Sequence, residues 1–241
     1  MEQAEQLSQD PLVLLPGMMC DARVFAPQIR ALSGQLPVMV APLLGGERIE
    51  DIALRLLPQL PQRFALAGLS MGGIVAMEIL RRAPERVSRL CLMSTSPLAD
   101  TPAQAASREP LIIGARTGRM QDVLRQSMRP EYLAPGPQRI EILNQLHQMG
   151  MELGEALFVS QTRALQRRRD QQGTLRKCKV PTLILCGEYD PLTPVKRHEF
   201  LAELIPNAAL EIVTAAGHLP TLERPDVVNR VLVDWLAESV P

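Results

Sequence analysis

The chain has 241 residues and no net charge at neutral pH, with 46% hydrophobic and only 3% aromatic residues. This length fits one domain with a large buried core, and the balanced charge and scarce aromatic side chains argue against nucleic acid or an anionic membrane surface as a partner. No apolar run reaches the roughly 18 residues of a membrane span, and the first ten residues are polar, so we expect a cytoplasmic protein.

Short apolar runs recur along the chain, and six of them predict strands. They lack the polar alternation of a half-solvated strand, which is typical of parallel strands covered on both faces. The six runs are residues 12–15, 38–41, 64–69, 90–93, 182–186 and 210–213.

Longer periodic segments separate these runs and predict helices. They are residues 22–32, 49–60, 70–82, 194–204 and 224–238. Strands that alternate with helices indicate a doubly wound α/β fold with a mainly parallel sheet of about six strands.

The alternation stops at residues 97–179, where no run predicts a strand. Helical patterns occupy residues 103–116, 120–128, 137–151 and 154–169. Prolines and glycines separate them. We therefore expect residues 1–96 and 180–241 to form the core and residues 97–179 to form a helical lid over the carboxyl edge of the sheet. The charged run at residues 166–170 predicts a solvated helix end.

The most informative motif is Gly68-Leu69-Ser70-Met71-Gly72, which joins a predicted strand to a predicted helix. This is the context of a nucleophile elbow, in which a serine hydroxyl projects from a strained turn and flanking glycines allow close backbone approach. A helix that begins behind Ser70 also offers unpaired N–H groups to a developing negative charge. By itself the motif is equally compatible with an ordinary glycine-rich turn.

Two later segments add an acid and a base in the order that such a serine needs. Asp190 follows the fifth predicted strand and His218 follows the sixth. The carboxyl ends of parallel strands share one edge, so Ser70, His218 and Asp190 can meet there as nucleophile, base and orienting acid. Taken singly, Asp190 could cap a turn, Glu188 could replace it as the acid, and His218 could be a turn residue.

Stabilising an oxyanion requires two backbone N–H groups aimed at the reacting oxygen. Met71 follows the nucleophile and is one candidate. Met18 is the other, because Gly17 allows the loop after the first strand to turn back over Ser70. An ordinary turn at Pro16-Gly17 is an equally open interpretation.

Together these segments resemble the α/β-hydrolase fold superfamily, in particular its small, cap-bearing, serine esterase-like members, from Leu12 to Leu236. The landmarks are Leu14-Leu15-Pro16-Gly17, Gly68-Leu69-Ser70-Met71-Gly72-Gly73, Pro84-Glu85-Arg86-Val87, the segment 180–187, Asp190 and Ala216-Gly217-His218. The resemblance implies a Ser70, Asp190 and His218 triad, with the Met18 and Met71 amides as oxyanion donors.

Two features depart from the family pattern. Many members have His-Gly where this chain has Pro16-Gly17. Members also usually carry two antiparallel strands before the first landmark, whereas only about ten polar residues precede Leu12 here. We therefore expect a sheet that is shortened at this edge.

Other side chains suggest the shape of the substrate and exclude some cofactors. Apolar residues expected to line the pocket are Met19, Met93, Leu124, Met128, Leu157 and Phe158, and flexible methionines suit a modest apolar group. The four cysteines predict buried free thiols because no C-x-x-C pair occurs. The three histidines lack metal-ligand spacing, so neither a metal nor another cofactor is expected.

These features favour an enzyme that hydrolyses a carboxylic ester of a small to medium, largely apolar substrate. A thioesterase, an enol-lactonase or a carbon–carbon bond hydrolase could use the same residues. The last would need a cation for a substrate carboxylate; the candidates are Arg108, Arg116, Arg119, Arg129 and Arg163. Acyl transfer and a small-molecule receptor with slow turnover remain alternatives.

Overall fold

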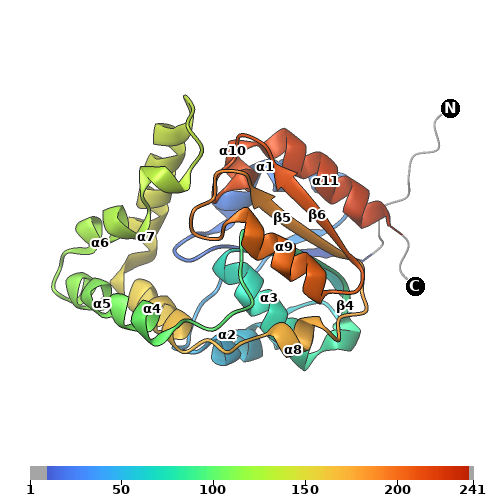
Figure 1. Cartoon of the computed structure of the whole chain (residues 1–241), viewed down its shortest axis with the longest axis horizontal. Helices are drawn as coiled ribbons and strands as arrows, with labels where there is room; N and C mark the ends of the chain where they lie inside the picture. The colour runs from blue at the N-terminus through green and yellow to red at the C-terminus, as the bar shows by residue number, and fades with distance from the viewer. Residues whose placement is uncertain (1–9, 239–241) are drawn as a thin grey trace.

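A computed structural model describes residues 10–238, and its six strands form one parallel sheet in the order β2-β1-β3-β4-β5-β6 (Figure 1). The strands are β1 (Leu12–Leu15), β2 (Val38–Val40), β3 (Phe64–Leu69), β4 (Val87–Met93), β5 (Thr182–Gly187) and β6 (Ala208–Val213). Every neighbouring pair is parallel. The predicted doubly wound sheet of six strands is confirmed.

Helices cover both faces of this sheet. One face packs against α1 (Ala26–Leu32) and α11 (Pro225–Ala237), and the other against α2 (Ile49–Leu56), α3 (Met71–Arg82) and α9 (Val195–Leu204). A short helix, α10 (Pro220–Glu223), precedes α11.

The residues of β1 show why the strands carry no polar alternation. Leu12 and Leu14 join the apolar cluster that contains Trp235 of α11, whereas Val13 and Leu15 join the cluster beneath α2 and α3. All four side chains of β1 are completely buried. Complete burial of a leucine contributes about 2 kcal/mol, so the side chains on both faces of β1 stabilise the fold.

The strand order reverses around β1, and this reversal places two loops together. The chain runs from β1 to β2 on one side and then returns to β3 on the other side of β1. Ligands of open parallel sheets bind outside the carboxyl ends of strands at such a switch point. The loop after β1 and the turn after β3 therefore meet there.

The segment between β4 and β5 is helical, and Figure 1 shows most of it beside the sheet. Its helices are α4 (Pro102–Ser107), α5 (Glu109–Arg116), α6 (Met120–Ser127), α7 (Arg139–Gln166) and α8 (Gln172–Leu175). We call residues 97–179 the insert. Helices α5, α6 and α7 share an apolar cluster of their own, whereas Leu175 in α8 packs into the core cluster beneath α3.

Two helix boundaries inside the insert differ from the sequence expectation. The single helix expected at residues 103–116 is divided into α4 and α5 near Arg108, because Pro110 occupies the first turn of α5. The two helices expected at residues 137–151 and 154–169 form one helix, α7, which kinks at Gly154 with φ 81°.

The arginines of the charged run at residues 166–170 form ion pairs. Arg168, expected on a solvated helix end, instead has a side chain only 13% exposed that pairs with buried Asp100 at 2.8 Å. Its neighbours Arg167 and Arg169 are more exposed and pair with Glu47 and Glu50.

All four cysteines lie within the described residues and are buried free thiols.

The sheet edge at β2 matches the expected shortening within the described residues. In residues 10–238 the sheet ends at β2, and no antiparallel strand lies beyond it; residues 1–9 lie outside the described residues. No helix in residues 10–238 combines the length and apolar character needed to cross a bilayer.

Candidate active site

Backbone strain is concentrated at the carboxyl edge of the sheet. In residues 10–238, four non-glycine residues have a positive φ, and each follows a strand. They are Met19 after β1, Ser70 after β3, Ser94 after β4 and Ala215 after β6. Sparsely populated backbone conformations cost about 1–3 kcal/mol each and cluster at functional sites. This edge is therefore the first candidate for the active site.

Ser70 occupies the turn between β3 and α3, with φ 53° and ψ −113°. Its N–H donates to the Met93 carbonyl at 2.8 Å, which fixes the turn to β4. A side chain at Gly68 would overlap the backbone of Gly72, and one at Gly72 would overlap the backbone of Leu15. Glycine is required on both sides of Ser70 because β1, β3 and α3 meet here.

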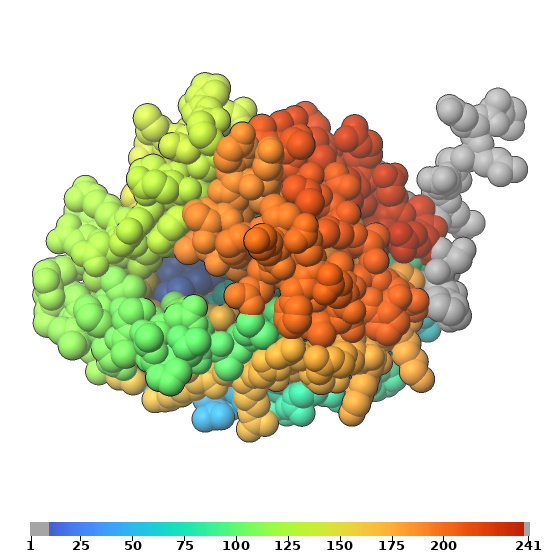
Figure 2. Space-filling model, viewed as in Figure 1, coloured from blue at the N-terminus to red at the C-terminus, as the bar shows by residue number. Residues whose placement is uncertain are grey.

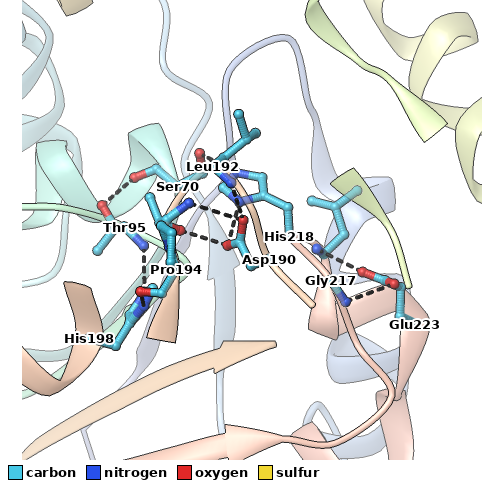
Figure 3. A network of polar contacts seen from close by, with 11 residues as sticks. Ser70, Thr95, Asp190, Leu192, Pro194, His198, Gly217, His218 and Glu223 are labelled. Carbon is cyan, nitrogen blue, oxygen red and sulfur yellow. Dashed lines mark hydrogen bonds and ion pairs between the residues drawn. The ribbon is translucent and has the colours of Figure 1, made fainter. Parts of the chain in front are cut away.

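Ser70, His218 and Asp190 form a continuous chain of hydrogen bonds (Figure 3). The Nε2 atom of His218 lies 2.9 Å from Ser70 Oγ, and its Nδ1 atom lies 2.8 Å from Asp190 Oδ2. When the ring is neutral, Nδ1–H donates to the carboxylate and Nε2 accepts from the serine hydroxyl. Three turns that are far apart in the sequence thus bring a hydroxyl, a base and an acid into line.

The carboxylate of Asp190 is buried and accepts further hydrogen bonds from its own turn. Oδ1 accepts from the N–H groups of Leu192 (2.9 Å) and Thr193 (3.1 Å), and Oδ2 accepts from the Thr193 hydroxyl (2.6 Å). Burial tends to raise the pKa of Asp190, but the charge and hydrogen bond of His218 and the bonds from Thr193 lower it below its usual range. Asp190 is therefore ionised at neutral pH.

Glu188, the alternative acid, does not take part in this chain. Its side chain is exposed, and Oε2 accepts from the Ala215 N–H at 3.2 Å. It supports the turn after β6 from outside, whereas Asp190 contacts the imidazole directly.

Glu223 in α10 holds the turn that carries His218, and no sequence pattern singled it out. Oε2 accepts from the N–H groups of Gly217 (2.9 Å) and Ala134 (2.6 Å), and Oε1 accepts from Leu219 N–H (3.0 Å). Burial raises the pKa of Glu223 against the opposing effect of these bonds. Since Ala134 belongs to the insert, one carboxylate joins the insert to the histidine turn.

A second buried histidine supports the serine turn from below (Figure 3). The Thr95 N–H donates to His198 Nε2 at 3.1 Å, so the ring proton resides on Nδ1, which donates to the Pro194 carbonyl at 3.3 Å. The Thr95 hydroxyl then donates to the Ser70 carbonyl at 2.8 Å. Burial lowers the pKa of His198 to about 4, so the ring is neutral at neutral pH.

Two backbone N–H groups beside Ser70 are free to bind a ligand oxygen. In residues 10–238, neither Met18 N–H nor Met71 N–H donates a hydrogen bond. Gly17 places the loop after β1 against the serine, since a Cβ on Gly17 would lie 3.7 Å from Ser70 Cβ. Met71 begins α3, where the helix leaves its first N–H groups unpaired.

The six expected pocket residues fall into two groups. Met19, Leu124 and Phe158 are buried in the apolar cluster of the insert, and Met128 and Leu157 are partly buried against it. Met93 instead is completely buried in the sheet core. Figure 2 shows a hollow between the green insert and the orange segment after β5, with dark blue N-terminal atoms at its floor.

The insert is the basic part of the molecule, a feature that the balanced total charge conceals. Residues 97–179 contain 13 Lys and Arg against 8 Asp and Glu, whereas the rest of the chain contains 13 against 18. Two of the candidate arginines are already paired, Arg108 with Asp100 (2.7 Å) and Arg163 with Glu47 (3.6 Å). The other three, Arg116, Arg119 and Arg129, are exposed.

Comparisons with known proteins find relatives along almost the whole chain. The model of the alpha/beta hydrolase family matches residues 12–231. A pimeloyl-[acyl-carrier protein] methyl ester esterase from Aromatoleum aromaticum is 29% identical over 239 residues, covering 91% of this chain and 95% of that protein.

Solved structures share the same fold. A thermophilic esterase from Thermogutta terrifontis has a TM-score of 0.85 at 24% identity, covering 96% of this chain and 90% of that chain. The enol-lactonase from Burkholderia xenovorans LB400 also has a TM-score of 0.85, at 23% identity, covering 96% of this chain and 92% of that chain.

Proposed function

The chain belongs to the alpha/beta hydrolase family, and from this premise we propose that it is a serine hydrolase that cleaves carboxylic esters of a small to medium, largely apolar substrate. The observation that carries the proposal is the position of His218, whose two ring nitrogens contact Ser70 Oγ and Asp190 Oδ2. A serine hydroxyl is a poor nucleophile until a base takes its proton, and this arrangement supplies the base.

In the first half of the reaction, Ser70 Oγ attacks the ester carbonyl while His218 Nε2 takes the hydroxyl proton. The carbonyl oxygen becomes an oxyanion, and the free N–H groups of Met18 and Met71 stabilise it. Ionised Asp190 stabilises the imidazolium and fixes its orientation. When the intermediate collapses, His218 returns the proton to the leaving alcohol, and the acyl group remains on Ser70.

In the second half, water replaces the alcohol. His218 takes a proton from water, the hydroxide attacks the acyl carbonyl, and the same two amides stabilise the second oxyanion. Collapse of this intermediate breaks the bond to Ser70 Oγ, which regains its proton from His218, and the free acid leaves. These steps balance without a metal or an organic cofactor.

The insert forms the other wall of the substrate site as a cap. Its cluster contains Met19, Leu124 and Phe158, with Met128 and Leu157 at its border. Flexible methionines adapt to varied apolar groups, which favours an aliphatic acyl chain over a charged one.

A methyl ester carried on an acyl-carrier protein is a second candidate substrate. The Aromatoleum relative is named for such a reaction, and the excess of cations in residues 97–179 would attract a carrier of net negative charge. A carrier-bound methyl ester should then react faster than the same free methyl ester. That advantage should shrink when the salt concentration rises.

The test is hydrolysis of p-nitrophenyl esters from acetate to laurate, with the Ser70→Ala variant as control. We expect turnover that peaks at one chain length and falls by about 10⁴-fold or more in the variant. Ester turnover that survives in Ser70→Ala, or no turnover on any ester by the wild type, would refute the ester hydrolase proposal.

A further inference from the structure

The loop that offers Met18 N–H is held by a side chain from the insert. The neighbouring Met19 N–H donates to Gln161 Oε1 at 2.8 Å, although the two residues lie 142 positions apart. Gln161 lies in α7 and is only 1% exposed. Its Nε2 atom donates to the Leu43 carbonyl at 3.0 Å, so both ends of the amide are used.

The peptide between Met18 and Met19 is fixed at both of its polar ends. Its N–H donates to Gln161, and its carbonyl accepts a weak bond from Cys20 Sγ at 3.4 Å. Met19 itself has a φ of 53°, a left-handed conformation that a methionine adopts only when its surroundings impose it. The Gln161 bond is one such constraint.

The Met19 side chain is tied to the same part of the molecule. It is completely buried in the apolar cluster of the insert, which also contains Phe158 from α7. Gln161 and Phe158 are three positions apart on this helix and therefore lie on neighbouring parts of its surface. Helix α7 thus contacts both the backbone and the side chain of Met19.

Of these two adjacent N–H groups, one is therefore hydrogen-bonded and the other is not. Met19 N–H is occupied by Gln161, whereas Met18 N–H donates to no atom of residues 10–238. Without Gln161, the Met18–Met19 peptide loses the bond that holds its N–H, and Met19 can leave its strained conformation. The Met18 N–H belongs to the preceding peptide, which shares the Met18 Cα, so a shift of the loop at Met18–Met19 also moves this N–H.

We propose that Gln161 is a positioning residue that sets the direction of the Met18 N–H and so couples the insert to oxyanion stabilisation. This inference rests on the proposed function of Ser70, Met18 and Met71. Gln161 does not touch the reacting atoms and acts only through the Met18–Met19 peptide.

The first experiment replaces Gln161 and measures how fast a fluorophosphonate labels Ser70. This reaction needs the activated serine and an oxyanion hole but no particular ester. Gln161→Met keeps the length of the side chain and removes both hydrogen bonds. A misplaced oxyanion donor should slow labelling and lower kcat by about 10- to 100-fold, with KM changed by less than about threefold.

Two matched variants identify which bond matters. Gln161→Glu keeps an acceptor for Met19 N–H and loses the donor to Leu43, so its labelling rate should stay within about fivefold of the wild type. Gln166→Met makes the same change on the same helix, where within residues 10–238 the Gln166 side chain donates to Ala105 and Glu109 of the insert alone. It should label at the wild-type rate. A folded Gln161→Met that labels like the wild type, or equal losses in Gln161→Met and Gln161→Glu, would overturn the proposal.

A second measurement uses the wild-type protein and does not depend on whether a variant folds. With selective ¹⁵N-methionine labelling, the amide signals of Met18 and Met71 should shift when Ser70 is phosphonylated. The Met19 signal should stay in place because Gln161 already holds its N–H. A shift of Met19 with no shift of Met18 would contradict the proposed role.

The two proposals can fail separately. If the wild type hydrolyses no ester but the fluorophosphonate labels Ser70, the ester hydrolase proposal fails, and the labelling rates still decide the role of Gln161. If the wild type hydrolyses esters through Ser70 and Gln161→Met matches it in every rate, only the Gln161 proposal fails. A wild type in which Ser70 is not labelled would overturn both.

Discussion

The carboxyl edge of the sheet and the helical insert contribute to the candidate site in different ways. The edge supplies the polar side chains themselves, since Ser70, Asp190 and His218 each lie in a turn that directly follows a strand. The insert supplies contacts that hold the surrounding backbone. Gln161 accepts from Met19 N–H in the loop after β1, and the Tyr132 carbonyl accepts from His218 N–H at 2.7 Å.

This division predicts a gradient of effects. A change to a reacting group removes a step of the reaction. A change to a supporting group only shifts the position of a reacting group. Supporting residues should therefore cost less activity than reacting ones.

Replacement of His218 by alanine should have the largest effect among these predictions. Without the imidazole, no side chain in residues 10–238 contacts Ser70 Oγ to take its proton, so kcat should fall by about 10⁴-fold or more while the fold persists. Ester hydrolysis and circular dichroism of His218→Ala check both parts. A loss below about 100-fold would show that another base serves Ser70.

Replacement of Asp190 by asparagine should come next. The amide preserves shape but removes the charge that stabilises the imidazolium and permits the wrong ring tautomer, so kcat should fall by about 10²- to 10⁴-fold. Glu188→Gln is the matched control, because Glu188 contacts Ala215 and not the imidazole. Its kcat should stay within about threefold of the wild type. Reversed effects of the two variants would assign the acid role to Glu188.

Replacement of Glu223 by glutamine tests a supporting residue that contacts both regions. Its two oxygens accept from three backbone N–H groups, and a glutamine would turn an N–H₂ group toward at least one of these donors. We expect the free energy of unfolding to fall by about 1–3 kcal/mol and kcat to fall by about 10-fold as the histidine turn loosens. Urea unfolding and steady-state kinetics measure the two effects, and an activity loss as large as that of His218→Ala would erase the proposed gradient.

The same division explains what the sequence could predict. The six strands, the glycine-flanked turn at Ser70 and the turns that carry Asp190 and His218 are encoded within a few neighbouring residues, so local patterns find them. The sheet and its helices are confirmed, and the structure places the three side chains within hydrogen-bonding distance. The roles of these residues stay predictions until the variants are measured.

The supporting contacts could not be read from local patterns. Gln161 meets Met19 across 142 positions and Glu223 meets Ala134 across 89, so only the folded chain brings each pair together. Met93 was expected at the pocket as one of several flexible methionines that suit an apolar substrate. The alternation of side chains in β4 instead directs it into the core.

Among the residues that support the site, His198 should have the smallest effect on activity at neutral pH when it is replaced by glutamine. A glutamine oxygen can accept from the Thr95 N–H as Nε2 of the ring does, so the hydroxyl of Thr95 can still support Ser70. We expect kcat at pH 7 to stay within about fivefold of the wild type. A loss of more than about 100-fold would place His198 among the reacting groups and contradict its position below the serine turn.

The stability of this variant should depend less on pH than that of the wild type. The pKa of His198 is about 4 in the folded protein, against 6.5 for an ordinary histidine, so between these values the unfolded chain binds more protons. The free energy of unfolding of the wild type must therefore fall as the pH drops from 6.5 towards 4. Between pH 7 and pH 4.5 the wild type should lose about 2–3 kcal/mol more than His198→Gln, which has no imidazole to protonate. If wild type and His198→Gln lose the same free energy of unfolding between the two pH values in urea titrations, the folded protein accommodates a charged His198. A charged ring cannot accept from Thr95 N–H. The chain of bonds from Pro194 through Thr95 to Ser70 would then not be what holds the serine turn in place.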